Sequence, residues 1–153
     1  MHAVIGDGSA HGGDETLDPK RSLLSEVHDG TLATEVWVPE RNLVDKPSWL
    51  SFEEAACLPT AWLTAYRMLF GHRPHILRPG HNVLVWGAAG GIGSMAVQLI
   101  ATAGANAIGV ISDPSKKDFV MSLGAKGVIN RNDFDCWGQL PDVDDQKGYA
   151  EYM

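Results

Sequence analysis

The chain lacks the features of secreted, membrane-spanning and nucleic-acid-binding proteins. Its 153 residues include only two cysteines, Cys57 and Cys136, which is too few for a disulfide framework and typical of a reducing compartment. No apolar run approaches the roughly 18–20 residues that cross a bilayer. Lysine and arginine number 12 against 19 acidic residues, a formal net charge of −7, so the clustered positive charge that a nucleic-acid backbone requires is missing. We therefore expect a cytoplasmic protein that binds neither nucleic acid nor membrane.

The first third of the chain shows little hydrophobic periodicity. Residues 6–30 are rich in Gly, Asp, Ser and His and are expected to form a long loop, which is unusual inside a compact domain. A short strand is expected over residues 34–38, where it is ended by Pro39.

Helix signals follow. Ser51 with Glu54 three residues later forms a capping box, which predicts a helix that begins near Phe52. We expect Pro59 to interrupt this helix, and a further helix to run over residues 61–70 and to stop at a glycine.

From residue 78 onward the pattern is much clearer. Residues 82–86 are almost continuously apolar, as in a strand buried on both faces of a parallel sheet. Residues 107–111 and 127–129 predict a second and a third strand. After the first strand, apolar residues recur at the spacing of one helix face, namely Ile92, Met95, Ala96, Leu99, Ile100 and Ala103.

A second helix is predicted between the later two strands. Pro114 suits its first turn, where the missing N–H is tolerated, and the buried stripe is expected to comprise Phe119, Val120 and Leu123. Strand, helix, strand, helix, strand at this spacing is half of a doubly wound, nucleotide-binding parallel sheet, so the predicted fold class is α/β.

The turn over residues 87–93 carries a dinucleotide-binding pattern in its proper context, between a buried strand and an amphipathic helix. Ala88 takes the first glycine position of that pattern, Gly90 the second and Gly93 the third. Gly90 lets the backbone approach a pyrophosphate, Gly93 lets the helix press against the strand, and free N–H groups at the helix start face the anion. The alternative is a tight turn that binds nothing. The predicted cofactor-binding residues of this segment are Gly87, Ala88, Ala89, Gly90, Gly91, Ile92 and Gly93.

The end of the second strand determines which dinucleotide is preferred, because a carboxylate there holds the ribose 2′-hydroxyl of NAD. If Ser112 occupies the strand tip, no carboxylate repels a 2′-phosphate, and Lys116 or Lys117 can neutralise it. If Asp113 occupies the tip, NAD is preferred, although Asp113 is also a candidate cap before Pro114. We favour NADP, because a charged phosphate selects basic neighbours.

These residues resemble a known superfamily. Residues 55–66 together with the glycine turn resemble the medium-chain dehydrogenase/reductase superfamily. The stretch from residues 66–75 to residues 133–141, with Trp86 before the glycine turn, is similar to crotonyl-CoA carboxylase/reductases. Residues 6–60 are similar instead to quinone-reductase-like, zinc-type alcohol dehydrogenases of the same superfamily.

The resemblance implies a domain organisation. It refines the fold class to a partial doubly wound (Rossmann) parallel sheet preceded by the end of a GroES-like β-barrel domain. Residues 1–50 would be the remnant of that substrate domain, residues 51–80 connecting helices, and residues 81–153 the first half of the NADP-binding domain. Such a chain would be incomplete by itself, and its exposed sheet edge is expected to drive self-association into a homo-oligomer.

The resemblance also implies an activity, in which an NADPH-dependent oxidoreductase sends hydride to the β-carbon of an enoyl-CoA thioester. The resulting enolate takes up carbon dioxide or a proton. Thr64 matches a threonine near the nicotinamide, Ser112 the strand-tip position and Lys116 the basic residue at the 2′-phosphate. Glu26 aligns with a glutamate of the carboxylase pocket; a surface carboxylate near a turn is the alternative. The alternative functions are a zinc-independent quinone or alcohol oxidoreductase, or a nucleotide-binding fragment without catalysis.

No metal site is expected. Zinc-dependent relatives place a cysteine four residues before Thr64, where this chain has Thr60, and the chain has no four-cysteine cluster for a structural metal. His72 and His75 are spaced like a ligand pair, but the intervening Arg73 and Pro74 favour a loop with solvated imidazoles.

Overall fold

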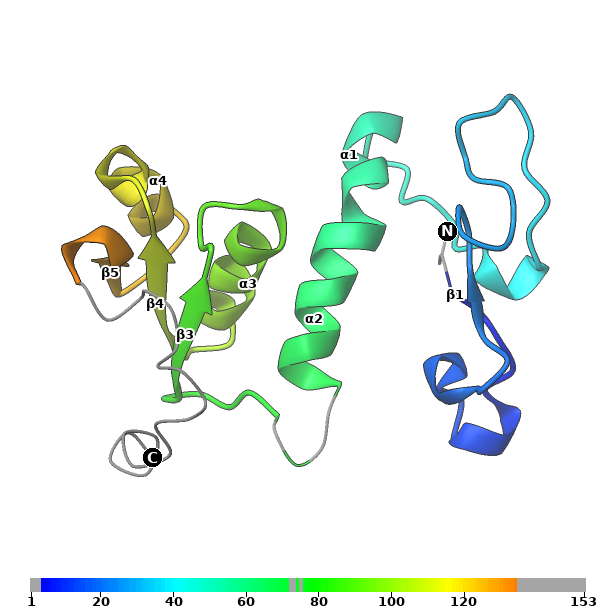
Figure 1. Ribbon diagram of the computed structural model, residues 1–153, viewed down its shortest axis with the longest axis horizontal. Coiled ribbons are helices and arrows are strands. Elements are labelled where there is room, and N and C mark those ends of the chain that lie inside the picture. Colours follow the sequence, from blue (N-terminus) through cyan, green and yellow to red (C-terminus); the bar gives the residue numbers. More distant parts are fainter. Residues whose placement is uncertain (1–3, 72–73, 75, 135–153) are drawn as a thin grey trace, which may run out of the picture. The chain divides into compact units, whose positions relative to one another are not determined.

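The computed structural model describes residues 4–71, 74 and 76–134. The chain divides into two compact units, Met1–Thr64 and Ala65–Met153, and each is described by itself (Figure 1). Among the described residues, no helix combines the length and apolar character needed to cross a bilayer.

The C-terminal unit is built on a parallel sheet with strand order β3-β4-β5. The strands are β3 (Asn82–Trp86), β4 (Asn106–Ile111) and β5 (Gly127–Asn130). Leu84 pairs with Ile108 and Gly109 with Val128, all in parallel register. The three predicted strands and their α/β arrangement are therefore confirmed.

Helices connect these strands as predicted. The helix α3 (Gly91–Thr102) follows β3, and the 3-10 turn η5 (Pro114–Lys116) leads into α4 (Lys117–Ser122) after β4. Gly104 and Gly124 follow the two α-helices with φ of 73° and 101°. Residues with a Cβ atom rarely adopt this left-handed backbone conformation, so glycine allows the chain to turn away at the end of each helix.

An apolar core lies between these helices and one face of the sheet. Its members are Leu77, Val85, Ala88, Val97, Ile100, Ala105, Ala107, Ile111, Val120 and Ala125. The predicted helix faces were only partly right, because Ile92 is 43% exposed and Phe119 is 49% exposed. The buried side of α3 is centred on Gly93, Val97 and Ile100 instead, since the close approach at Gly93 sets which side of the helix meets the sheet.

The prediction that β3 is buried on both faces was wrong. Val85 is buried, whereas Leu84 and Trp86, which alternate with it, are 55% and 51% exposed. Both helices cover the face of Val85: a side chain at Gly109 would meet Val120 of α4, and Val97 of α3 packs in the same core. The opposite face of β3 therefore remains open to solvent.

The N-terminal unit contains short elements joined by turns. Strand β1 (Val4–Ile5) pairs antiparallel with β2 (Ser22–Leu23), with the 3-10 turns η1 (Ser9–His11) and η2 (Glu15–Leu17) between them. A third 3-10 turn, η3, spans Glu40–Asn42. The predicted loop over residues 6–30 is thus an ordered segment, and the described residues of this unit close no barrel.

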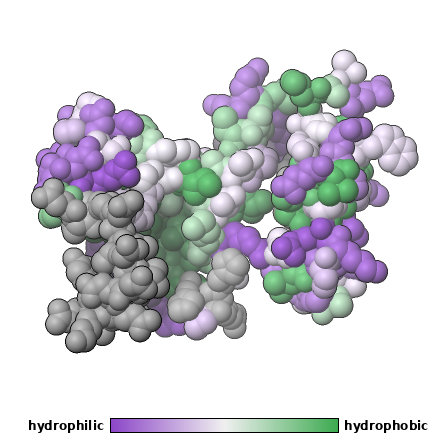
Figure 2. Space-filling view, viewed as in Figure 1, coloured by the Kyte–Doolittle hydropathy of each residue, from purple (hydrophilic) through white to green (hydrophobic). Residues whose placement is uncertain are grey.

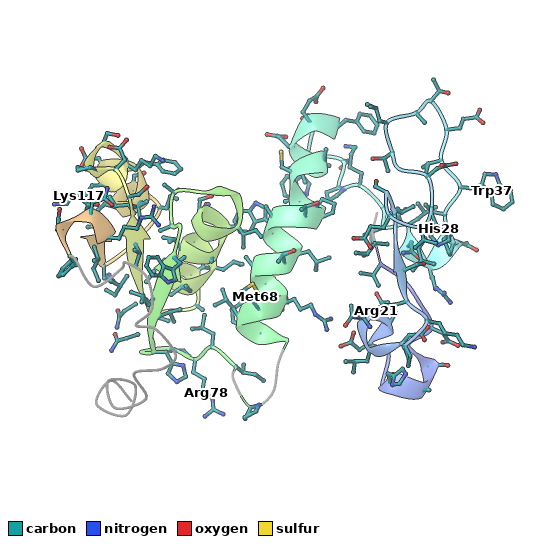
Figure 3. All side chains as sticks on the ribbon, viewed as in Figure 1. Arg21, His28, Trp37, Met68, Arg78 and Lys117 are labelled. Atoms are coloured by element: carbon teal, nitrogen blue, oxygen red, sulfur yellow. The ribbon has the colours of Figure 1, made fainter. Side chains whose placement is uncertain are left out.

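The strand predicted over residues 34–38 is not formed. Trp37 is 98% exposed and projects away from the chain in Figure 3. A strand requires a partner for its backbone N–H and C=O groups, and no described strand pairs with this segment. Figure 2 shows further apolar side chains at the surface of this unit.

A helical segment runs across the boundary between the units as α1 (Phe52–Cys57), the π-helical turn η4 (Leu58–Trp62) and α2 (Leu63–Phe70). The predicted capping box is confirmed: the N–H of Ser51 donates to Glu54 Oε2 (2.8 Å), and the N–H of Glu54 donates to Ser51 Oγ (3.1 Å). As predicted, the α-helix is interrupted at Pro59: α1 ends at Cys57, and α2 starts only after the π-helical turn η4. Pro59 lies in the first turn of η4, where its missing N–H is tolerated.

Candidate functional site

The glycine-rich turn is fixed to the sheet by backbone hydrogen bonds. After β3 the chain turns at Gly87, which has a φ of 59°, and the N–H of Gly90 donates to the Gly87 carbonyl at 2.8 Å. The N–H of Ala88 donates to the carbonyl of Val110 in β4 at 3.1 Å. The turn therefore has one defined conformation at the carboxyl end of β3.

Gly93 allows the start of α3 to lie directly against this turn. A Cβ atom at Gly93 would overlap the carbonyl oxygen of Gly87 and lie 2.9 Å from the Cα of Ala88. Neither of these backbone atoms can swing aside like a side chain. The structure thus gives a physical reason for glycine at the position that the sequence pattern assigned to close packing between helix and strand.

The N-terminus of α3 is arranged to hold an anion. Gly90 is the N-cap and provides no side-chain cap, and the first helical hydrogen bond runs from the Ser94 N–H to the Gly90 carbonyl (2.9 Å). The N–H groups that precede Ser94 have no acceptor within the helix. A Cβ atom at Gly91 would meet nothing within 4 Å, so the space at the first helical residue is open. Free N–H groups and the positive end of the helix dipole favour a phosphate in such a place.

The end of β4 presents a hydroxyl and two ammonium groups. Ser112 directly follows the strand and is exposed, as are Lys116 at the end of η5 and Lys117 at the start of α4. Lys117 is labelled in Figure 3 at the beginning of its helix. These side chains are free to meet a ligand at this edge of the sheet.

Asp113 is a helix cap, which is one of the two roles that the sequence left open. Its Oδ1 atom accepts a hydrogen bond from the Ser115 N–H at 2.9 Å. That bond, and to a smaller extent the charge of Lys116, holds the pKa of Asp113 below its usual range. The carboxylate is thus ionised and already bonded to the turn, which leaves Ser112 as the residue at the strand tip.

The parallel register brings the glycine turn and Ser112 to one edge of the sheet. Trp86, the last residue of β3, pairs with Val110, and Ile111 pairs with Asn130 at the end of β5. The arrowheads of β3 and β4 in Figure 1 point to this common edge. Ligands of open α/β sheets bind outside the carboxyl ends of the strands, so this edge could hold a ligand; the binding roles of the predicted residues stay predictions.

Two predicted site residues belong to the N-terminal unit, and their roles stay predictions. Thr64 is half-buried in the first turn of α2. Glu26 is exposed in the turn after β2, where its N–H donates to the Leu23 carbonyl at 3.3 Å. This environment is that of a surface carboxylate near a turn, the alternative that the sequence offered for Glu26.

Within the described part of the chain, no three His, Cys, Asp or Glu side chains gather in a group that could hold a metal ion. Cys57 is exposed, and its thiol donates to the Glu53 carbonyl at 3.4 Å. His72, His75 and Cys136 lie outside the described residues.

Sequence reasoning missed one residue at this edge. The side-chain amide of Asn132 donates to the carbonyl oxygen of Ser112 at 2.7 Å. Asn132 lies in η6 (Arg131–Asp133), the 3-10 turn that follows β5. The available signal was an asparagine three residues after a predicted strand whose end must lie beside Ser112.

Comparison with known proteins places the chain among related sequences, although no family model matches it. It is 56% identical over 148 residues to the crotonyl-CoA carboxylase/reductase of Cereibacter sphaeroides, an alignment that covers 96% of this chain and 34% of that protein. A solved crotonyl-CoA carboxylase/reductase superimposes with a TM-score of 0.84 and 52% identity, covering 99% of this chain and 36% of the other. The homologues and structural neighbours of this chain are medium-chain dehydrogenases/reductases.

The resemblance stated from the sequence is therefore confirmed. The neighbours comprise crotonyl-CoA carboxylase/reductases together with zinc-type alcohol dehydrogenases and quinone oxidoreductases. The alignment with the Cereibacter protein runs through both parts of the chain that had resembled different relatives. The crotonyl-CoA carboxylase/reductase AntE, solved in complex with NADP, has a TM-score of 0.84 and 37% identity over 98% of this chain and 38% of its own. The chain spans about a third of the length of the curated relatives that it matches.

Proposed function

We propose that this chain is the part of a cytoplasmic, NADPH-dependent enoyl-thioester reductase that holds the nucleotide. The observation that carries the proposal is the glycine turn, whose open helix N-terminus lies at the same sheet edge as Ser112 and Lys116. Homology to crotonyl-CoA carboxylase/reductases supports the substrate class, an acyl-CoA with a conjugated double bond. The cytoplasm fits a chain with two cysteines and no disulfide framework.

The residues present fit the two phosphate-bearing ends of NADPH. The uncapped N–H groups at the start of α3 would hold the diphosphate, because the space beside Gly91 is open and leaves room for it to approach the backbone. Ser112 and Lys116 would hold the 2′-phosphate, one by a hydrogen bond and the other by charge. Asp113 caps the following turn through its bond from the Ser115 N–H, and the charges of Lys116 and Lys117 would offset its carboxylate.

Homology to crotonyl-CoA carboxylase/reductases supports the reaction. When bound, NADPH would supply the hydride for the β-carbon of the enoyl thioester. The electron pair of the double bond passes to the thioester as an enolate, which then bonds to carbon dioxide at the α-carbon or takes a proton there. The described C-terminal unit would bind and orient the adenosine end of the nucleotide. Other parts of the enzyme would set the distance and direction of hydride transfer from the nicotinamide to the substrate.

Isothermal titration with NADPH and NADH tests the proposal. We expect NADPH to bind the purified chain more tightly than NADH. Replacing Lys116 by Ala should weaken NADPH about ten- to hundredfold and NADH less than twofold, because a charge-assisted hydrogen bond to the 2′-phosphate is lost. Lys126→Ala is the matched control, since Lys126 is equally exposed and precedes β5 at the opposite edge of the sheet.

The outcomes separate the alternatives. Equal affinity for the two nucleotides, or an equal effect of the two lysine substitutions, would contradict the assignment of the 2′-phosphate site. If this chain carries every residue that hydride transfer needs, the addition of crotonyl-CoA should lead to consumption of NADPH. Nucleotide binding without turnover on any enoyl thioester identifies the chain as a nucleotide-binding part only.

We also propose that the chain self-associates through the edge of its sheet. In the order β3-β4-β5, β3 is an edge strand of the described sheet, and Leu84 and Trp86 on it are half exposed. Unpaired edges and exposed apolar faces favour association. Sedimentation should show dimers or larger species, and a strictly monomeric chain at high concentration would refute this.

A further inference from the structure

One hydrogen bond in the C-terminal unit joins two loops at the edge proposed to hold the nucleotide. We infer that Asn132 is a positioning residue that sets the preference for NADPH over NADH by fixing the backbone of Ser112. This inference rests on the proposed function, because it assigns Asn132 a part in the same site. Asn132 is not expected to touch the cofactor; it would act through Ser112.

The contact is a hydrogen bond between residues 20 positions apart in the sequence. The amide Nδ2 of Asn132 donates to the backbone carbonyl of Ser112, and the separation of 2.7 Å is at the short end for N–H···O bonds. Ser112 is the first residue after β4, whereas Asn132 lies in η6 after β5. The bond therefore ties the tip of one strand to the turn that leaves its neighbour.

Asn132 is itself held in place. Its backbone N–H donates to Asn130 Oδ1 at 3.2 Å, and Asn130 Nδ2 donates to Asp133 Oδ1 at 2.9 Å. Asn130 pairs in register with Ile111, the residue before Ser112. The donor of the Ser112 bond thus belongs to a turn anchored in the sheet, which is what a positioning group requires.

The segment after Ser112 is anchored as well. Asp113 caps η5 through Ser115, and the N–H of Lys116 donates to the Asp113 carbonyl at 3.1 Å. Ser112 therefore lies between two fixed points, Asn132 on one side and the η5 turn on the other. A displacement of Ser112 would move both groups proposed to meet the 2′-phosphate, its own hydroxyl and the Lys116 ammonium.

The chemistry of the contact suits a phosphate neighbour. A backbone carbonyl oxygen carries partial negative charge and repels a phosphate when it faces one. In this structure the Ser112 carbonyl is occupied by a neutral amide donor, which fixes its direction without adding a charge that would compete with Lys116. The effect should depend on the 2′-phosphate, because NADH places only a hydroxyl there.

A purely structural cross-link would act differently, and the chain offers a matched control. Asn106 Nδ2 donates to Asn82 Oδ1 at 3.0 Å, also an exposed side-chain amide bond between neighbouring strands. This pair lies at the amino ends of β3 and β4, at the edge opposite Ser112. Asn106→Ala removes a comparable bond without touching the nucleotide edge.

The test is titration of the full chain and its Asn132→Ala, Asn132→Asp and Asn106→Ala variants with NADPH and NADH. We expect Asn132→Ala to weaken NADPH about three- to tenfold, the value of one hydrogen bond, with less than twofold effect on NADH. Asn132→Asp should weaken NADPH at least as much, because a carboxylate cannot donate to the carbonyl and repels the phosphate. Asn106→Ala should leave the ratio of the two affinities unchanged.

Each outcome is decisive. If the unmodified chain binds neither nucleotide, the proposed function fails and this inference falls with it. If it prefers NADPH but Asn132→Ala and Asn106→Ala keep the same affinity ratio, the inference alone is overturned. Partial unfolding of a variant does not blur the result, because it lowers the binding stoichiometry for both nucleotides equally and leaves their ratio intact.

Discussion

The two units of this chain are stabilised by different interactions. In the C-terminal unit, buried apolar residues of α3, α4 and the sheet form one core. Among the described residues of the N-terminal unit, the buried hydrophobic side chain is Leu24 and the buried polar one is Asn42. This unit is organised instead by backbone turns and by aspartate side chains that accept from them, such as Asp18 from the N–H groups of Asp7 and Lys20.

This difference in stabilisation explains why the candidate site in the C-terminal unit could be predicted from sequence. A core of periodic apolar residues fixes the glycine turn and the strand tips within one stretch of chain, so the nucleotide edge is defined by neighbours in sequence. The N-terminal unit exposes large apolar side chains such as Leu32 and Trp37. Its turns are held by bonds that are individually weak in water, so its conformation is more easily changed.

The largest expected effect compares one side chain from each unit. Ile100→Ala should lower the free energy of unfolding by about 2–5 kcal/mol, because it leaves a cavity in the core around a fully buried residue. Trp37→Ala should change it by less than about 0.5 kcal/mol, since the indole is almost wholly exposed. Urea unfolding followed by far-UV circular dichroism measures both. A loss at Trp37 as large as that at Ile100 would contradict the exposed position of the indole.

A glycine pair tests whether the turn itself depends on close packing. Gly93→Ala should destabilise the C-terminal unit by about 1–3 kcal/mol, because the added methyl group meets the backbone of residues 87 and 88. Gly91→Ala, two residues earlier, places its methyl group in open space and should be neutral or slightly stabilising. Thermal melting distinguishes them, and equal melting temperatures would show that the helix can move away from the turn at no cost.

The N-terminal unit has its own sensitive position. Asn42 is 2% exposed, and its amide donates to the carbonyl of Val4 in β1 at 2.6 Å. Asn42→Ala should cost about 1–2 kcal/mol by leaving that carbonyl without its partner. Protection of the β1 and β2 backbone amides against hydrogen exchange measures this loss of stability in the N-terminal unit. Unchanged protection there would mean that bonds other than this one hold the unit together.

The smallest effect is a response to acid that begins in the N-terminal unit. Hydrogen bonds from Ser9 lower the pKa of Asp7, and those from the backbone N–H groups of Asp7 and Lys20 lower that of Asp18. Because the folded-state pKa lies below the unfolded one, this stabilisation is complete above about pH 4 and is lost as pH falls through the folded values.

Spectra recorded between pH 5 and pH 2 by NMR test this response, with amides of residues 7–20 shifting first. Asp18→Asn keeps an acceptor oxygen but does not titrate, so the response of the Asp7 and Lys20 amides should be reduced in that variant. An unaltered response would place its origin in other groups.

Much of the C-terminal unit could be predicted from sequence because its signals are local. The apolar run of β3, the glycines that end α3 and α4, and Pro114 at the start of η5 each specify their own element. The orientation of the helices was less predictable. Ile92 has helical spacing with the core residues, but contact between Gly93 and the turn decides which side of α3 is buried.

Other errors came from interactions between distant residues. The β-branched and aromatic residues over 34–38 suit a strand, but pairing depends on a neighbouring strand that local sequence does not specify. Asn132 has no role until the register places β5 beside β4 and its amide within reach of Ser112.

The central claim is that backbone N–H groups at the start of α3 hold the diphosphate of a nicotinamide nucleotide. Titration of the isotope-labelled chain with NADP⁺, followed through its amide resonances by NMR, tests this most directly. The largest shifts are predicted at residues 90–93, with smaller ones at residues 112–117. Shifts confined to other parts of the chain, or none at saturating nucleotide, would contradict the account.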